Sequence, residues 1–198
     1  MILAFLRGLE KAPTFLVPII NPPFADNSPH LSPGVSSKSV SARRMRMDKK
    51  DTLAKRYERI FSQLIPLLSK TKNRTARMAT IASLLHLKMP RFFWTGFYAL
   101  DRGELTVGPY QGPLACLVLE KKKGVCWAGV LRRRTIIVPD VHKFPGHIAC
   151  DSRSNSEIVV PLFDAKGKVW GVLDIDSREL DAFSEVDREW LEKIVGVI

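Results

Sequence analysis

The chain has 198 residues, of which 45% are hydrophobic, and a formal net charge of +11. This length and apolar content predict one globular domain with a sizeable core. No apolar run approaches the roughly 18 residues needed to cross a bilayer, so we do not expect a membrane protein. We also find no apolar segment followed by a small-residue cleavage site, and the three cysteines do not suit a secreted disulfide framework. We therefore expect a cytoplasmic protein.

The positive charge is concentrated in the first half of the chain. Residues 1–91 hold 17 Lys and Arg against 5 Asp and Glu, whereas residues 92–198 hold 14 against 15. Such a basic segment can bind nucleic acid or an anionic membrane surface. Most aromatic residues nevertheless lie in the neutral half, so the combination of charge and base stacking is missing. We interpret the charge as a solvated helical face plus a basic tail, and do not expect a nucleic-acid partner.

Residues 1–46 are predicted to be a disordered basic extension. They hold six prolines followed by a serine-rich stretch, and no period of 2 or 3.6 persists. Met45 and Met47 close this segment, which suggests the hypothesis that the natural start of translation is one of these two methionines. The single domain is then expected over residues 47–198.

Two amphipathic helices are predicted to open the domain. From Asp48, apolar residues recur with helical spacing, and Pro66 is expected to kink or end this first helix. A second helix is expected over about residues 73–87, with Pro90 as its stop. The apolar stripe of the second helix consists of Met78, Ile81, Ala82 and Leu85.

The remainder of the domain is predicted to be mostly strands. In chain order we expect strands over residues 92–100, 104–110 and 114–119, a short helix over 124–132, and strands over 135–138, 157–163 and 169–176. The first two strands and the last two strands each form a hairpin. A final helix begins at Ser184, where Asp187 completes a capping box. This order predicts an α+β fold with a central antiparallel sheet flanked by helices.

A long polar loop over residues 144–157 is centred on Cys150. Long loops in compact domains are usually functional or disordered, and a cysteine on an ordered polar loop is a candidate reactive thiol. A cationic His147 close to this thiol would lower the pKa of Cys150. His142 and His147 could equally be structural.

The other two cysteines are Cys116 and Cys126. The three cysteines are 10 and 24 residues apart, which matches no zinc signature, and we expect no bound metal. A buried, inert thiol is the common alternative to a reactive one. Cys126, between Val125 and Trp127, fits that alternative best, and Cys150 fits it least.

Acidic and aromatic residues on the predicted strands suggest a binding site. Asp174 and Asp176 share one face of the last strand, and hairpin pairing should bring Glu157 close to them. These carboxylates are either a solvent-facing strand end or a site that binds a cation such as an amino group, or donates a proton. A hard metal is a weaker interpretation because a thiol lies at the same place. Trp94 and Tyr98 share one face of the first strand and could form core or wall an apolar pocket.

Five motifs in this chain resemble those of the free methionine-(R)-sulfoxide reductases, which are single-domain GAF-fold enzymes. They are WTGFY from Trp94, GPYQGPLAC ending at Cys116, KGVC ending at Cys126, DVHKFPGHIACDSRSNSEIVVPL around Cys150, and GVLDIDS ending at Ser177. With the two preceding helices, the resemblance covers roughly three quarters of the chain and leaves out the tail.

The resemblance implies a role for each candidate residue. It implies that Cys150 is the catalytic cysteine, that Cys116 resolves it by forming a disulfide, and that Cys126 is auxiliary. The implied substrate-binding residues are Trp94 and Tyr98 around the substrate methyl group and Glu157, Asp174 and Asp176 as the acidic residues.

The implied reaction reduces free methionine-R-sulfoxide, which suits an oxidative stress response. The Cys150 thiolate attacks the sulfoxide sulfur, becomes a sulfenic acid and condenses with Cys116 to a disulfide. Thioredoxin or another dithiol then restores both thiols, with no bound cofactor. Asp176, and Glu157 second, is our candidate for the carboxyl that protonates the sulfoxide oxygen. A homodimer fits a GAF domain.

The main alternative is a non-catalytic GAF module that senses a small molecule. A sensor has no need of Cys116 and Cys150 together, and it usually sits beside an output domain. Turnover of the sulfoxide distinguishes the two hypotheses.

Overall fold

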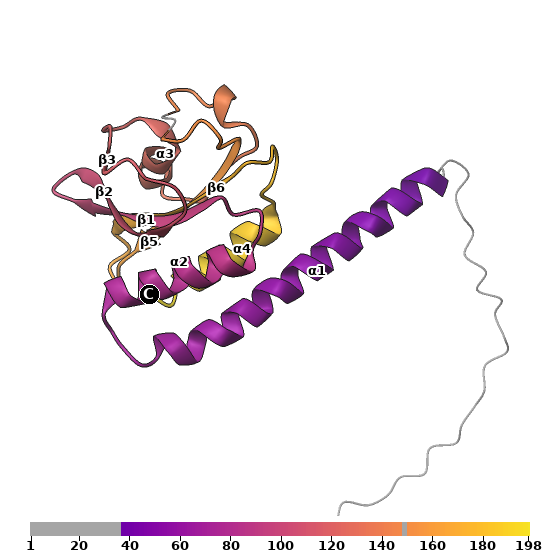
Figure 1. The fold of residues 1–198 in the computed structure, drawn as a ribbon, viewed down its shortest axis with the longest axis horizontal. Helices are drawn as coiled ribbons and strands as arrows, with labels where there is room; N and C mark the ends of the chain where they lie inside the picture. The colour runs from indigo at the N-terminus through magenta and orange to yellow at the C-terminus, as the bar shows by residue number, and fades with distance from the viewer. Residues whose placement is uncertain (1–36, 148–149) are drawn as a thin grey trace, which may run out of the picture.

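The computed structural model describes residues 37–147 and 150–198. In these residues, helices cover a six-stranded antiparallel sheet in the order β3-β2-β1-β6-β5-β4 (Figure 1). The elements are α1 (Ser37–Leu68), α2 (Arg74–Lys88), β1 (Trp94–Asp101), β2 (Glu104–Gln111), β3 (Val118–Leu119), α3 (Gly124–Arg132), β4 (Ile136–Val138), the 3-10 helix η1 (Val141–Lys143), β5 (Ser156–Phe163), β6 (Val169–Ser177) and α4 (Glu185–Val195). The predicted α+β architecture and both hairpins are confirmed. None of the helices in this part of the chain combines the length and apolar character that crossing a membrane requires.

Helix α1 begins earlier than the sequence suggested. It starts at Ser37, so the prediction of disorder does not hold for residues 37–46, while residues 1–36 lie outside the described chain. The physical reason is that residues 37–65 contain neither glycine nor proline and are rich in the helix formers Lys, Arg, Met and Ala. The first half of α1 extends past the rest of the domain (Figure 1).

Helix α1 also continues past Pro66 and ends at Leu68, whereas an end near Ile65 was one of the two outcomes expected. A proline removes one backbone hydrogen bond, the one that its own nitrogen would donate to residue i−4. Because Pro66 lies in the last turn, only that bond is lost, and the helix still closes with Ser69 donating to the Ile65 carbonyl. Helix α2 agrees with the prediction within one residue at each end and is capped by the side chain of Asn73.

The sheet separates two hydrophobic clusters. Helices α2 and α4 lie on one face, with α1 packed against them on the side away from the sheet, as Figure 1 shows, and α3 covers the other face. Along β1, Phe97 packs into the first cluster, whereas Trp94 and Tyr98 belong to the second. Along β6, Leu173 and Ile175 likewise pack under the three helices. The period of two therefore places the candidate site residues of β1 and β6 on the α3 face.

A buried polar cluster joins α1 to α4. The Tyr57 hydroxyl donates to Oδ1 of Asp187 at 2.6 Å, and Arg91 forms an ion pair with the same fully buried carboxylate. Asp187 also accepts the backbone N–H and hydroxyl of Ser184. The capping box expected at the start of α4 is thus confirmed, and its acidic residue additionally holds α1 in place.

The strand expected over residues 114–119 is much shorter than predicted. Only Val118 and Leu119 pair with β2, and Cys116 lies in the preceding loop rather than on a strand. Val107 donates one further bond to the Leu117 carbonyl, and the ladder ends there. The physical reason is that Pro109 of β2 has no N–H to donate to a neighbouring strand.

Candidate active site

Strand pairing brings the three predicted carboxylates together. In the β5–β6 hairpin, Glu157 lies opposite Asp176, and Val159 lies opposite Asp174. On the other side of β6, Trp94 of β1 lies opposite Asp176. Directly opposed residues of an antiparallel pair point to the same face. The convergence of Glu157, Asp174 and Asp176 expected from the sequence is therefore confirmed, and Trp94 stands beside them.

These carboxylates are not at a solvent-facing edge of the sheet. Glu157 is 5% exposed and Asp174 is 7% exposed, because β1 and β5 flank β6 and α3 lies over this face. No amide, hydroxyl or guanidinium group of the described residues donates a hydrogen bond to the buried Oδ1 of Asp174. A buried carboxylate oxygen without such a donor is costly and suits a ligand that brings its own N–H groups.

Burial and mutual repulsion determine which carboxyls hold protons. Desolvation and the neighbouring carboxylates raise the pKa of Glu157 well above its ordinary value, and desolvation together with Asp174 raises the pKa of Asp176 in the same way. Desolvation raises the pKa of Asp174 to about 6, where hydrogen bonds from Cys126 and Glu157 limit the rise. Asp174 is therefore the carboxyl of the group that ionises most readily, while Glu157 and Asp176 keep their protons to higher pH.

We expect Asp174→Asn to stabilise the folded protein at pH 8 and to have a smaller effect at pH 5. A carboxyl whose pKa is about 6 when folded and near 3.8 when unfolded favours folding below pH 3.8, and this contribution is lost as the pH rises through 6. An asparagine does not titrate, so the variant does not lose this contribution to the free energy of unfolding, which amounts to about 1–3 kcal/mol at pH 8. Urea unfolding at the two pH values measures the difference.

The exposed Asp101, which lies at the β1–β2 turn, offers a matched control. Asp101→Asn is expected to leave the free energy of unfolding unchanged at both pH values. Equal effects of Asp174→Asn at pH 5 and pH 8 would contradict the assignment of Asp174 as a buried group with a raised pKa.

Cys126 lies directly behind the carboxylates. Its sulfur and one oxygen each from Glu157 and Asp174 lie within 4.8 Å of one another. Helix α3 can come this close because a Cβ on Gly129 would stand only 2.8 Å from Val159 Cγ1. Cys126 is buried, as its sequence context suggested, and burial raises the pKa of its thiol, which disfavours the reactive thiolate.

These same three groups are the candidate metal ligands among the described residues. Metal ligation requires a thiolate and ionised carboxylates. Here burial raises the pKa of Cys126 and of Glu157, which favours the protonated forms. The donor set therefore fits a proton-sharing cluster better than a metal site, and the absence of a metal stays a prediction.

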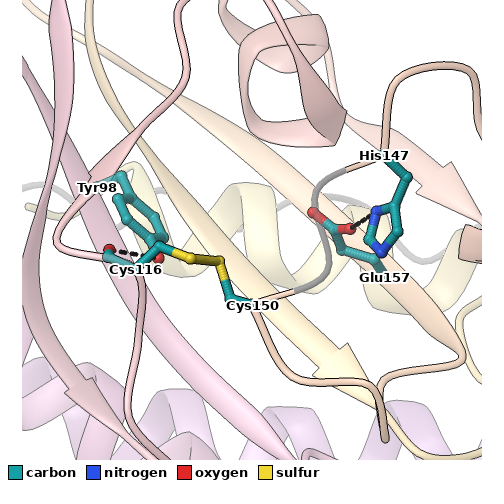
Figure 2. Close-up of a disulfide and its surroundings, with 5 residues drawn as sticks. All are labelled: Tyr98, Cys116, His147, Cys150 and Glu157. Atoms are coloured by element: carbon teal, nitrogen blue, oxygen red, sulfur yellow. Dashed lines mark hydrogen bonds and ion pairs between the residues drawn. A yellow bond between two sulfur atoms is a disulfide. The ribbon is translucent and has the colours of Figure 1, made fainter.

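Cys116 and Cys150 are joined in a disulfide (Figure 2). Their Cα atoms lie 5.7 Å apart although the residues are separated by 34 positions in the sequence. The Tyr98 hydroxyl donates to the Cys116 carbonyl at 3.3 Å, which ties the Cys116 loop to β1. The pairing implied by the sequence resemblance is thus the one present in the structure, and it spans the loop before β3 and the loop before β5.

An aromatic wall stands beside the disulfide. The Trp94 ring stacks on Tyr98 with centroids 5.8 Å apart and on Tyr110 with centroids 5.4 Å apart. Gly96 makes room for this stack, since a Cβ there would lie 2.4 Å from both Trp94 Cη2 and Tyr110 Cβ. Tyr110 was not predicted as a site residue. The pairing of Gly96 with Tyr110 in the β1–β2 hairpin is the signal that could have revealed it.

His147 lies beside the carboxyl group of Glu157. Its Nδ1 lies 3.9 Å from Glu157 Oε2, and Figure 2 shows the two side chains facing each other. Burial lowers the pKa of His147, which disfavours the cation that activation of Cys150 would require. The geometry therefore favours the structural alternative considered for this histidine.

Ser154 and Arg153, which follow Cys150 in the same loop, contact acidic residues. Ser154 is 6% exposed and hydrogen-bonds to Asp176, and it was not singled out in the sequence. Arg153 binds Asp151 through two nitrogens and lowers the pKa of Asp151 to about 2. Asp151 therefore stays ionised, and it is not a proton donor. Ile148 and Ala149, part of the predicted loop, lie outside the described residues.

One cavity brings together Cys150, the three carboxyl groups and part of the aromatic wall. It is lined by Trp94, Tyr98, Leu114, Ala115, Leu119, Val125, His147, Cys150, Asp151, Ser154, Glu157, Asp174 and Asp176. It thus presents the disulfide-bonded Cys150, three carboxyl groups of raised pKa and the aromatic rings of Trp94 and Tyr98 to one small molecule. Such a combination of an apolar wall with a few convergent polar groups of altered pKa is typical of an active site.

Comparison with known proteins identifies the family. The GAF domain family model matches residues 78–198. The chain is 43% identical over 150 residues to GAF domain-containing protein A of Dictyostelium discoideum, covering 75% of this chain and 94% of that protein. It is 42% identical over 121 residues to free methionine-R-sulfoxide reductase of Escherichia coli (strain K12), covering 61% of this chain and 73% of that protein. The chain belongs to the free methionine-R-sulfoxide reductase family of GAF domains.

A solved structure of another member supports this assignment. The X-ray structure of free methionine-R-sulfoxide reductase from Neisseria meningitidis, determined in complex with its substrate, is 38% identical. It superposes with a TM-score of 0.68 over 71% of this chain and 84% of that one. The single GAF domain and the reductase family expected from the sequence motifs are therefore confirmed.

Proposed function

We propose that this protein reduces free methionine-R-sulfoxide to methionine, with Cys150 as the nucleophile. The observation that carries the proposal is that Cys150, which is joined to Cys116, lines the same cavity as the buried carboxyl cluster. A thiol, a proton source and a binding site for an amino group are the three elements that this reaction needs at one place. The family membership supports the same activity.

Substrate recognition is assigned to the carboxylate and the aromatic wall. The buried Asp174 Oδ1 is available to accept a hydrogen bond from the ammonium group of the free amino acid. Trp94 and Tyr98 flank the other side of the cavity and can enclose the methyl group on sulfur. A methionine within a polypeptide lacks the ammonium group, so selection of the free amino acid follows from Asp174.

The chemical step transfers oxygen from the substrate to Cys150. The Cys150 thiolate attacks the sulfoxide sulfur, and Asp176 protonates the sulfoxide oxygen so that the S–O bond can break. The resulting hydroxyl group passes to the Cys150 sulfur as the bond between that sulfur and the substrate sulfur breaks, so methionine leaves and Cys150 becomes a sulfenic acid. The thiol of Cys116 then attacks the Cys150 sulfur, which releases water and forms the disulfide.

A dithiol completes the cycle. Thioredoxin or another dithiol donates two electrons and two protons to the Cys116–Cys150 disulfide and becomes a disulfide itself. The sum of these steps converts one sulfoxide and one dithiol into methionine, one disulfide and water. No bound cofactor is required by this balance.

Turnover of the two sulfoxide epimers tests this function against the sensor alternative. The purified chain with dithiothreitol is expected to consume free methionine-R-sulfoxide and to leave the S epimer unchanged, an expectation that rests on the family membership. Chiral chromatography of the remaining sulfoxide measures both rates. Absence of turnover for either epimer by the folded, reduced protein would favour a GAF module that only binds a ligand.

A further inference from the structure

An exposed apolar segment surrounds the resolving cysteine. Leu114 is 87% exposed, Leu117 is 73% exposed and Val118 is 51% exposed. These three residues lie within five positions of one another and flank Cys116 on both sides. We call them the Cys116 patch. Scattered exposed hydrophobic residues are normal, but a group of them beside a reactive bond indicates an interaction surface.

We propose that the Cys116 patch is the docking surface for the dithiol protein that reduces the Cys116–Cys150 disulfide. This inference rests on the proposed function, which requires such a reductant. Cys150 is exposed and Cys116 is half-buried, so the disulfide is open to the surface beside the patch. The chain from residue 113 to residue 119 carries no charged side chain. The central part of a protein interface is depleted of charge in the same way.

The position of the patch in the sheet supports a protein partner. Strand β3 lies at one end of the strand order and pairs only with β2, so its outer edge has no partner strand among the described residues. An unpaired edge can bind an extended backbone segment of another chain through main-chain hydrogen bonds. Val118 belongs to this edge strand, and Leu117 directly precedes it. A partner bound here has its main chain within reach of the Cys116 loop.

The two electrons and two protons that reduce the disulfide after docking all come from the dithiol of the partner. A thiolate of the partner attacks one sulfur of the Cys116–Cys150 bond, and the other sulfur leaves as a thiolate and takes up a proton. The partner's second thiol then attacks its own sulfur in the mixed disulfide. The partner leaves as a disulfide, and Cys116 and Cys150 are both thiols, having gained two electrons and two protons.

Leu117 allows docking to be tested separately from the chemistry, because it does not line the cavity and is not one of the two disulfide-bonded residues. We would mix the oxidised full chain with reduced thioredoxin, quench with an alkylating reagent, and measure loss of the disulfide by mass spectrometry. No sulfoxide is present, so the result does not depend on the proposed reductase activity. For Leu117→Glu, the second-order rate constant with thioredoxin is expected to fall at least about tenfold. With dithiothreitol, which needs no docking surface, it should stay within about twofold of wild type.

Leu87 provides a matched control, since it is also 73% exposed but lies in α2, on the other side of the sheet from the cavity. Leu87→Glu is expected to change neither rate constant. An unchanged rate with thioredoxin in Leu117→Glu would overturn the proposal, as would an equal fall with both reductants. If light scattering instead shows that Leu117→Glu alters self-association while the thioredoxin rate is kept, the patch is an interface between copies, and the proposal is wrong.

Discussion

Cys150→Ser is expected to reduce turnover of free methionine-R-sulfoxide to below about one thousandth of the wild-type rate, because a serine hydroxyl is not ionised at neutral pH and cannot accept the oxygen. Cys150 is the cysteine of the redox pair that lines the cavity, whereas Cys116 does not line it. The loss should appear in kcat with every reductant. Release of methionine by the purified variant, measured by chromatography, provides the test.

Cys116→Ser is the matched variant in the same disulfide. It keeps Cys150, so a single addition of sulfoxide without reductant should still release about one methionine per chain. The sulfenic acid cannot then form the internal disulfide, and recycling by thioredoxin should be lost while dithiothreitol still reduces Cys150 directly. The reverse pattern, with a single turnover in Cys150→Ser and none in Cys116→Ser, would exchange the two assignments.

Asp176→Asn is expected to lower kcat by about 100- to 1,000-fold, which is the range for loss of a positioned general acid. Asp176 retains part of its surface at the cavity, whereas Glu157 is more buried and one of its oxygens lies within 4.8 Å of a carboxylate oxygen of Asp174. We therefore expect a smaller effect of Glu157→Gln on kcat than of Asp176→Asn. Both variants keep the size of the side chain and replace its titratable carboxyl with an amide, which cannot donate that proton.

The pH dependence of kcat distinguishes a proton donor from a residue that only binds. Burial and Asp174 raise the pKa of Asp176, so the wild-type rate should fall as the pH rises through that raised value and the proton is lost. In Asp176→Asn this decrease should disappear, because an amide does not titrate. If Asp176→Asn keeps both its kcat and the alkaline decrease, Glu157 becomes the donor instead.

Local patterns in the sequence were sufficient for most of the fold. The bounds of α3 agree with the structure at both ends, and those of α2 agree within one residue. The shared face of Asp174 and Asp176, and the approach of Glu157, followed from the period of two and from one short hairpin. Such features depend on residues close in sequence, and the residues therefore carry a readable signal.

Features that depend on distant segments could not be obtained in this way. Whether the carboxylates lie at an exposed strand end or are buried beside a cavity depends on α3 and on the residues that follow Cys150, which come from elsewhere in the chain. Tyr110 in the aromatic wall and Ser154 beside Asp176 also reach the site from segments outside the last hairpin.

The cysteines show the same division. Residue types and spacing singled out Cys150, and motif resemblance suggested Cys116 as its partner, but the loop that holds Cys116 was predicted to be a strand. Whether a segment becomes a strand depends on the N–H and C=O groups that a neighbouring strand offers. Pro109 of the neighbouring strand β2 has no N–H group to donate. The sequence thus indicated the chemistry of the site through its residue types. Burial, proton sharing and the surroundings of the disulfide arise from contacts between segments far apart in the chain.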